Sequence, residues 1–200
     1  QPGDKLLKET DVILTIGYNP VEYDTEIWNA KGQAKLIHLN TLPPHIHNTY
    51  RPDIEIIGNL ADNVDRLTHF LTETDKICDK KNIEILQKEL YDVIKSGATH
   101  TGERVHPLRF IYELNQFVDE DTTIVSDIGT HYMWLARYLL SYEPRHLLFS
   151  NGQQTLGVSI PWAISTRLVR PNNKIISISG DGGFLFSSME LETAMRNKTH

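Results

Sequence analysis

The sequence predicts an α/β protein built on doubly wound parallel sheets, because short apolar strands alternate with amphipathic helices along most of its 200 residues. The alternation is most regular after Pro107, where helices and strands take turns to the end of the chain. In addition, three glycine-bearing segments each follow a predicted strand and open a predicted helix. We therefore expect two partial Rossmann-like domains, each with its own parallel sheet.

The N-terminal stretch contains three short strands and a closing helix. The runs "DVILTIG" from Asp11, "KLIHLN" from Lys35 and "IEIIGN" from Ile54 are apolar and rich in β-branched residues, as buried parallel strands are. In "NLADNVDRLTHFLTETD" the apolar residues recur at helical spacing, which predicts a helix that ends near residue 75.

A polar region follows the first domain. It contains one predicted helix, "NIEILQKELYDVIK", and then the breaker-rich run "SGATHTGERVHP". We therefore expect a first domain over residues 1–75, a linker over residues 76–105 and a second domain over residues 106–200.

The second domain is expected to contain four helices and three strands. The predicted strands are "TTIVSD", "LLFS" and "KIISISG", and the first three helices are "LRFIYELNQFV", "HYMWLARYLL" and "GVSIPWAISTRLV". The fourth helix, "SSMELETAMR", is expected to begin at Ser187 or Ser188, because a serine followed by Glu190 is typical of a capped helix start. Large aromatic residues on these helices are expected to pack in the core or at an interface: Trp134, Tyr138 and Trp162.

The three glycine-bearing segments are "DIGTH" (127–131), "NGQQTLG" (151–157) and "GDGGF" (180–184). They follow the carboxyl ends of parallel strands, where α/β sheets bind ligands. Glycines let backbone amides approach an anion such as a diphosphate closely. Asp181 would repel that anion unless a divalent cation such as Mg²⁺ lay between them, so the loop is suited to a metal-bridged diphosphate. An ordinary tight turn between strand and helix remains open as the alternative.

Composition excludes several classes of function. The net charge is −6 and no Lys/Arg stripe is present, so a nucleic-acid partner is not expected. No apolar run is long enough to span a bilayer. Cys78 is the only cysteine, which rules out an internal disulfide and fits a reducing cytoplasm. His45 and His47 have no third ligand nearby, so we expect a solvent-facing loop there.

The run "ISGDGGFLFSSMELETA" resembles the start of the signature of thiamine-diphosphate enzymes. Together with "DIGTHYMWLARYLLSYEPR" and "SNGQQTLGVSIPWAIS", in that order, it resembles the cofactor half of the catabolic, FAD-independent acetolactate synthases. The run "DVILTIGYNPVEYD" resembles their central domain, without the Arg-Phe-Asp-Asp-Arg stretch typical of the flavin-binding relatives. The resemblance implies the C-terminal part of the central domain over residues 1–75, with no FAD, and the N-terminal part of the thiamine-diphosphate domain over residues 106–200.

The resemblance also implies roles for individual residues. Asp181 would coordinate Mg²⁺, and backbone groups of the following two residues would contact the metal-bound diphosphate of thiamine diphosphate. Leu156 would hold the cofactor in its bent form, and the backbone carbonyl of Gln154 would receive the pyrimidine amino group. The full set of cofactor-binding residues implied in this way is Gly129, Thr130, His131, Gln154, Leu156, Asp181, Gly182 and Gly183.

The implied activity is the decarboxylation of pyruvate and its condensation with a second pyruvate to give 2-acetolactate and CO₂. The resemblance implies a dimer or tetramer, and an activating glutamate and a second metal ligand outside these 200 residues. We therefore expect a fragment of a longer chain that is inactive by itself. Three alternatives remain: another thiamine-diphosphate enzyme, such as a pyruvate oxidase or a ketoacid decarboxylase; a non-catalytic nucleotide-binding module; and a folded piece without a ligand.

Overall fold

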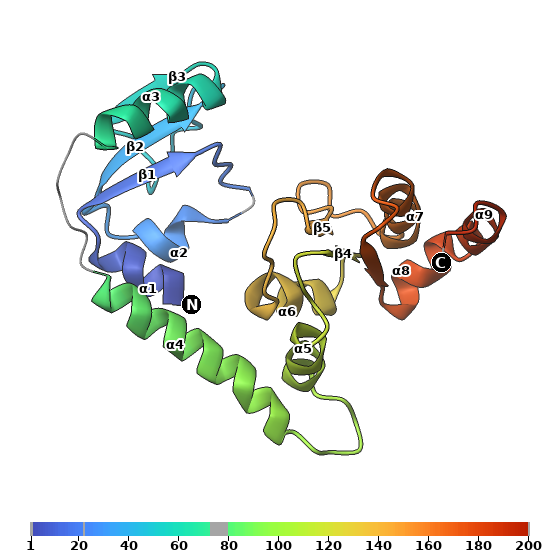
Figure 1. The fold of residues 1–200 in the computed structure, drawn as a ribbon. Helices are drawn as coiled ribbons and strands as arrows, with labels where there is room; N and C mark the ends of the chain where they lie inside the picture. Colours follow the sequence, from blue (N-terminus) through green and yellow to red (C-terminus); the bar gives the residue numbers. More distant parts are fainter. Residues whose placement is uncertain (1, 22, 73–79, 200) are drawn as a thin grey trace. The chain divides into compact units, whose positions relative to one another are not determined.

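The computed structural model describes residues 2–21, 23–72 and 80–199, so Cys78 and the predicted domain boundary near residue 75 lie outside the described residues. The chain divides into two compact units, Gln1–Glu89 (unit 1) and Leu90–His200 (unit 2) (Figure 1). Each unit contains a three-stranded parallel sheet with helices packed against it, which confirms the predicted α/β class.

Unit 1 contains the three predicted strands in the order β1-β2-β3. They are β1 (Val12–Ile16), β2 (Lys35–Asn40) and β3 (Ile54–Ile57), and α3 (Leu60–Thr72) is the predicted closing helix. Two helices that the pattern did not predict precede β2, namely α1 (Pro2–Glu9) and α2 (Thr25–Asn29). Both are short, and helices of this length owe their stability to tertiary packing rather than to local sequence.

The core of unit 1 lies between the sheet and the first two helices. Ile13, Leu36, Trp28 and Tyr50 are buried there and form one cluster. The hydroxyl of Tyr50 lies 2.6 Å from the Thr15 hydroxyl and 2.8 Å from Nδ1 of His38. Burial raises the pKa of Tyr50, so the phenol donates or accepts hydrogen bonds in its neutral form. This network joins β1, β2 and the chain that follows β2.

Unit 2 contains the other three predicted strands, in the order β5-β4-β6. They are β4 (Thr122–Ser126), β5 (Leu147–Phe149) and β6 (Lys174–Ile178). A long helix, α4 (Lys81–Ser96), leads into the unit and is followed by η1 (Gly97–Thr99). The remaining helices are α5 (Pro107–Asn115), α6 (Thr130–Tyr138), α7 (Ser159–Val169), α8 (Asp181–Ser187) and α9 (Glu190–Arg196).

Helices cover both faces of the unit 2 sheet, as expected for a doubly wound sheet (Figure 1). On one face, α5 and α6 pack their buried residues against Ile124, with Ile176 and Ile178 of β6 beside them. On the other face, α7 packs against β4 and β6. Trp134 and Tyr138 pack against the first of these cores, as predicted, whereas Trp162 on α7 is 39% exposed.

One helix begins earlier than predicted. Instead of starting at Ser187 or Ser188, the helical segment after β6 starts at Asp181, is interrupted at residues 188–189 and resumes as α9. The N–H of Phe184 donates to the carbonyl of Gly180 at 2.9 Å, so the glycines after Asp181 form the first helical turn. Glycine by itself disfavours a helix, so the sequence pattern did not predict helical structure at Gly182 and Gly183. The packing of this turn against other segments favours the helix there.

Across the described ranges, no helix is both long enough and apolar enough to cross a lipid bilayer.

The two leucines Leu135 and Leu185 offer a matched test of the unit 2 core. Leu135 on α6 is fully buried, whereas Leu185 on α8 is 71% exposed. We expect Leu135→Ala to lower the free energy of unfolding by about 2–5 kcal/mol, because it leaves a cavity. Leu185→Ala should change it by less than about 0.5 kcal/mol. Urea unfolding of the chain followed by tryptophan fluorescence measures both, and equal losses would contradict the assigned core.

Candidate cofactor site at the carboxyl ends of β4 and β6

The strand order of unit 2 creates a switch point between β4 and β6. From β4 the chain crosses first to β5 on one side and then to β6 on the other side. Ser126 pairs with Ile178 at the carboxyl ends, and the N–H of Asp127 donates to the Ile178 carbonyl at 2.8 Å. The segments after β4 and β6 therefore start side by side, in the place where open parallel sheets bind their ligands.

His131 joins the first and third glycine segments. Its ring packs so closely on two glycines that a Cβ on Gly129 would lie 2.9 Å from Cε1, and one on Gly180 would lie 3.6 Å from the same atom. Gly129 is the N-cap of α6, and its φ of 155° favours glycine. Nε2 of His131 is buried and has no hydrogen-bond partner among the described residues. A buried nitrogen without a partner is an uncommon feature that a bound group would explain.

Asp127 joins the second glycine segment to the first. Its side chain is fully buried, and its oxygens accept three backbone N–H groups. Oδ1 accepts from Ile128 at 2.8 Å and from Gly157 at 3.0 Å. Oδ2 accepts from Gly157 at 2.9 Å and from Ser159 at 3.3 Å. The loop before α7 is therefore anchored to the end of β4 by one carboxylate.

The third glycine segment packs on the same carboxylate. A Cβ on Gly183 would lie 2.8 Å from Cγ of Asp127 and 2.9 Å from its Oδ2, so only glycine fits there. A Cβ on Gly182 would meet no described atom within 4 Å, and Asp181 is exposed. Hence one side of this turn packs against Asp127, and the other side is open to a ligand.

Gln154, Leu156 and Thr130 lie on the outer parts of these segments. Thr130 is the first residue of α6 and is exposed. Gln154 is exposed and has a φ of 50°, which is uncommon for a residue other than glycine. Leu156 is 43% exposed, although it directly precedes the buried Gly157. The contacts predicted for these three residues stay predictions.

The three segments meet around one site, and their residues fit a diphosphate better than they fit a metal ion alone. The orphaned His131 nitrogen, the open face of Gly182 and the exposed Asp181 can all meet an anion with a bridging cation. No group of three His, Cys, Asp or Glu side chains suited to a metal occurs in the part of the chain that the structure describes. Asp181 is an exposed carboxylate that could share a bridging cation with such an anion.

Sequence reasoning missed the role of Asp127. It recognised the residue only as the first letter of a glycine segment, because nothing local shows that its carboxylate reaches amides 30 and 32 residues further along. The available signal was an aspartate at the end of the predicted strand "TTIVSD", whose residues the structure shows to be buried. An acidic side chain at such a position needs hydrogen-bond donors from elsewhere in the fold.

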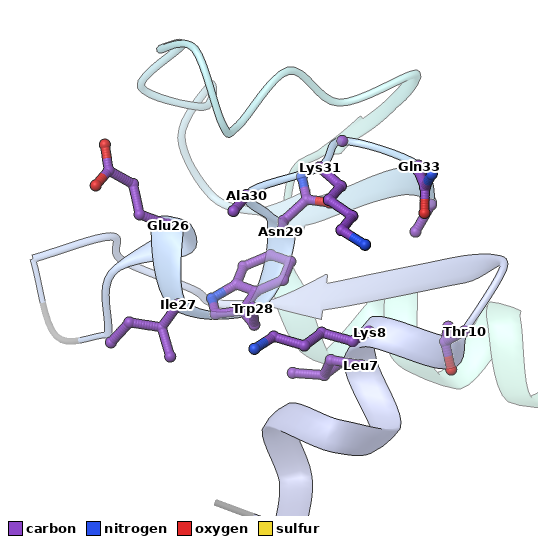
Figure 2. A pocket seen from close by; sticks show the side chains of 12 residues that line it. Leu7, Lys8, Thr10, Glu26, Ile27, Trp28, Asn29, Ala30, Lys31 and Gln33 are labelled. Atoms are coloured by element: carbon purple, nitrogen blue, oxygen red, sulfur yellow. The ribbon is translucent and has the colours of Figure 1, made fainter.

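A cavity of about 330 Å³ lies in unit 1, away from the glycine segments in sequence. Figure 2 shows the indole of Trp28 at its centre, with Leu7 and Lys8 of α1 beside it. None of the predicted site residues lines this cavity.

Neighbouring glycines test the packing of the third segment. We expect Gly183→Ala to destabilise the protein by about 1–3 kcal/mol, because its methyl group would overlap Asp127. Gly182→Ala has room for its methyl group and should stabilise the helix or leave it unchanged within about 1 kcal/mol. Urea unfolding without added cofactor measures both. An equal effect of the two substitutions would show that the turn does not pack on the carboxylate.

Comparison with known proteins gives a family match for the part of the chain that contains the three glycine segments. Residues 127–200 match the family model "Thiamine pyrophosphate enzyme, C-terminal TPP binding domain". The chain is 45% identical over 199 residues to an acetolactate synthase of Bacillus subtilis (strain 168), covering 99% of the chain and 35% of that protein. It is 44% identical over 200 residues to a catabolic acetolactate synthase of Raoultella terrigena, covering 98% of the chain and 35% of that relative.

A third relative, a probable acetolactate synthase large subunit of Methanococcus aeolicus, is 30% identical over 96% of the chain and 35% of its own length. The chain thus spans about a third of the length of the curated relatives that it matches. The chain is thus similar to acetolactate synthases over nearly all of its length, and its residues 127–200 match the C-terminal TPP-binding domain of thiamine pyrophosphate enzymes.

Proposed function

We propose that the protein to which this chain belongs is an acetolactate synthase, which decarboxylates pyruvate and joins the product to a second pyruvate to give 2-acetolactate and CO₂. The observation that carries the proposal is the meeting of three glycine segments around Asp127 and His131 at the carboxyl ends of β4 and β6. The relatives named acetolactate synthase that match the chain over nearly all of its length support the same reaction.

In this proposal two segments hold the diphosphate of thiamine diphosphate from opposite sides. Gly129, Thr130 and His131 lie on one side, and His131 offers the buried nitrogen that lacks a partner. Gly182 and Gly183 lie on the other side, where the open face of Gly182 leaves room for a phosphate oxygen. Asp181 would supply a carboxylate oxygen to Mg²⁺, and the cation would offset the repulsion between that carboxylate and the diphosphate.

The second segment orients the cofactor. The exposed Leu156 side chain would hold the two rings of thiamine diphosphate, and the Gln154 carbonyl would accept a hydrogen bond from the pyrimidine amino group. When bound, thiamine diphosphate supplies the electron sink that allows pyruvate to lose CO₂. The chain's contribution is to hold the rings in one orientation, which lowers the entropic cost of reaching the reactive geometry.

Further proposals concern the whole protein, of which this chain is expected to be a part. We propose self-association into a dimer or tetramer, with the remaining part of the active site supplied by regions outside this chain. We also propose that residues 1–75 form part of a central domain that carries no FAD and that residues 76–105 are the linker. A cytoplasmic location is consistent with Cys78 as the only cysteine.

The test of function is product analysis with the full-length protein. Pyruvate consumption, CO₂ and acetolactate are measured with and without thiamine diphosphate and Mg²⁺, and without added FAD. Acetolactate formed only when both cofactors are present supports the proposal. Acetaldehyde or acetyl phosphate as the product would instead identify a ketoacid decarboxylase or a pyruvate oxidase, and no consumption would favour a non-catalytic binding module.

The metal role of Asp181 can be tested separately. We expect Asp181→Ala in the full-length protein to abolish Mg²⁺-dependent retention of thiamine diphosphate, because the exposed carboxylate would be the protein's link to the cation. Calorimetric titration with the cofactor, with and without Mg²⁺, measures this. Asp121→Ala, which alters an exposed aspartate before β4, is the control and should bind normally. Unchanged affinity of the Asp181 variant would exclude the metal role.

A further inference from the structure

We infer that Asp127 is the positioning residue of this site: its buried carboxylate holds residues 154–159 in the conformation that receives the cofactor before the cofactor arrives. This segment is called the orienting segment below. The inference rests on the proposed function, because it assigns to Asp127 the placement of Gln154 and Leu156. Asp127 itself is not assigned any contact with the cofactor or the substrate.

The hydrogen bonds select a carboxylate at this position. Gly157 precedes α7 and Ser159 is its first residue, so neither N–H has a partner within the helix. Both donate to Asp127, and the N–H of Ile128 donates as well. A carboxylate offers only acceptors and has two oxygens to share among three donors. An asparagine of the same shape would turn an NH₂ group towards one of these N–H groups.

The backbone of the orienting segment is unusual in a way that requires support. Gln154 has a φ of 50°, and Gly157 has a φ of 82°. Such conformations persist where the surroundings hold them, and they cluster at functional sites. Gly157 is held from two directions, because its N–H binds Asp127 and a Cβ there would lie 2.6 Å from Cβ of Phe186. Leu156 is therefore attached directly to a residue that cannot move freely.

The same carboxylate also contacts the third glycine segment, so it fixes the position of that segment relative to the orienting segment. Gly183 packs against Cγ of Asp127, so the turn that carries Asp181 and Gly182 rests on the group that holds the orienting segment. The backbone of Asp127 is in turn hydrogen-bonded to the end of β6. Displacement of this one side chain would shift Leu156 and the diphosphate-facing turn relative to each other. A shift of about 1 Å in such a site can cost about a hundredfold in rate.

A purely structural role for Asp127 makes a different prediction. In that case Asp127→Asn would lower the stability of the protein, and a variant kept folded at low temperature would bind and turn over normally. If Asp127 positions the orienting segment, the folded variant loses cofactor affinity and turnover, and its orienting segment becomes mobile before any cofactor is added. Amide exchange in the cofactor-free protein separates the two possibilities.

The experiment compares the full-length wild type, Asp127→Asn and the control Asp121→Asn, which changes an exposed aspartate at the opposite end of β4. Hydrogen–deuterium exchange, resolved to single amides, is measured without cofactor at a temperature below every unfolding transition. In the wild type and the control, the N–H groups of Gly157 and Ser159 should exchange about a hundredfold more slowly than free amides. In Asp127→Asn this protection should be lost, while the strand amides of β4 keep theirs.

Calorimetry with thiamine diphosphate and Mg²⁺ should then show about a tenfold to hundredfold weaker binding for Asp127→Asn, and kcat at saturating cofactor should fall by a similar factor. The inference is overturned if Gly157 and Ser159 exchange freely in the cofactor-free wild type, a result that does not depend on whether the variant folds. It is also overturned if the folded variant keeps affinity and kcat within about twofold. Failure of the wild type to bind the cofactor would instead refute the proposed function.

Discussion

The buried carboxylate of Asp127 contacts all three glycine segments of unit 2 and holds them together. It accepts N–H groups from the loop after β4 and from the start of α7, and the glycine turn of α8 packs against it. A buried polar group is costly unless its hydrogen bonds are satisfied, so these partners are required by the burial itself. The glycines follow from the same constraint, because Gly157 and Gly183 lie where a side chain would collide with Phe186 or with Asp127.

The arrangement is possible because of the order of the strands. β4 lies in the middle of the sheet, and the chain visits β5 before it crosses to β6. The carboxyl ends of β4 and β6 therefore lie side by side while the helices that follow them leave on different faces. The ring of His131 lies between these two strand ends. It packs against a glycine after β4 and a glycine after β6, and one of its nitrogens has no described hydrogen-bond partner.

Unit 1 also has a parallel sheet, but its buried polar groups find their hydrogen-bond partners in another way. Its buried hydroxyls and imidazole satisfy one another through Thr15, Tyr50 and His38, and among the described residues of unit 1 no glycine turn packs onto a charged group. Aromatic rings fill the neighbouring space, with Tyr18 and Trp28 in edge-on or tilted contact with Tyr50. The contrast agrees with the assignment of the cofactor chemistry to unit 2.

The sequence by itself determined the class of the fold, the six strands found in the described residues and the three glycine segments, because these depend on local apolar patterns and on glycines next to strand ends. The resemblance to thiamine-diphosphate enzymes also implied that Gly183 and His131 belong to one cofactor site, and this assignment stays a prediction. Only the tertiary structure decided which groups hold that site together. The carboxylate of Asp127 meets the N–H groups of Gly157 and Ser159 across a sequence separation that no local pattern spans. The early start of α8 at Asp181 was missed for the same physical reason, since local propensity opposes a helix through two glycines and the packing of Gly183 on Asp127 favours it.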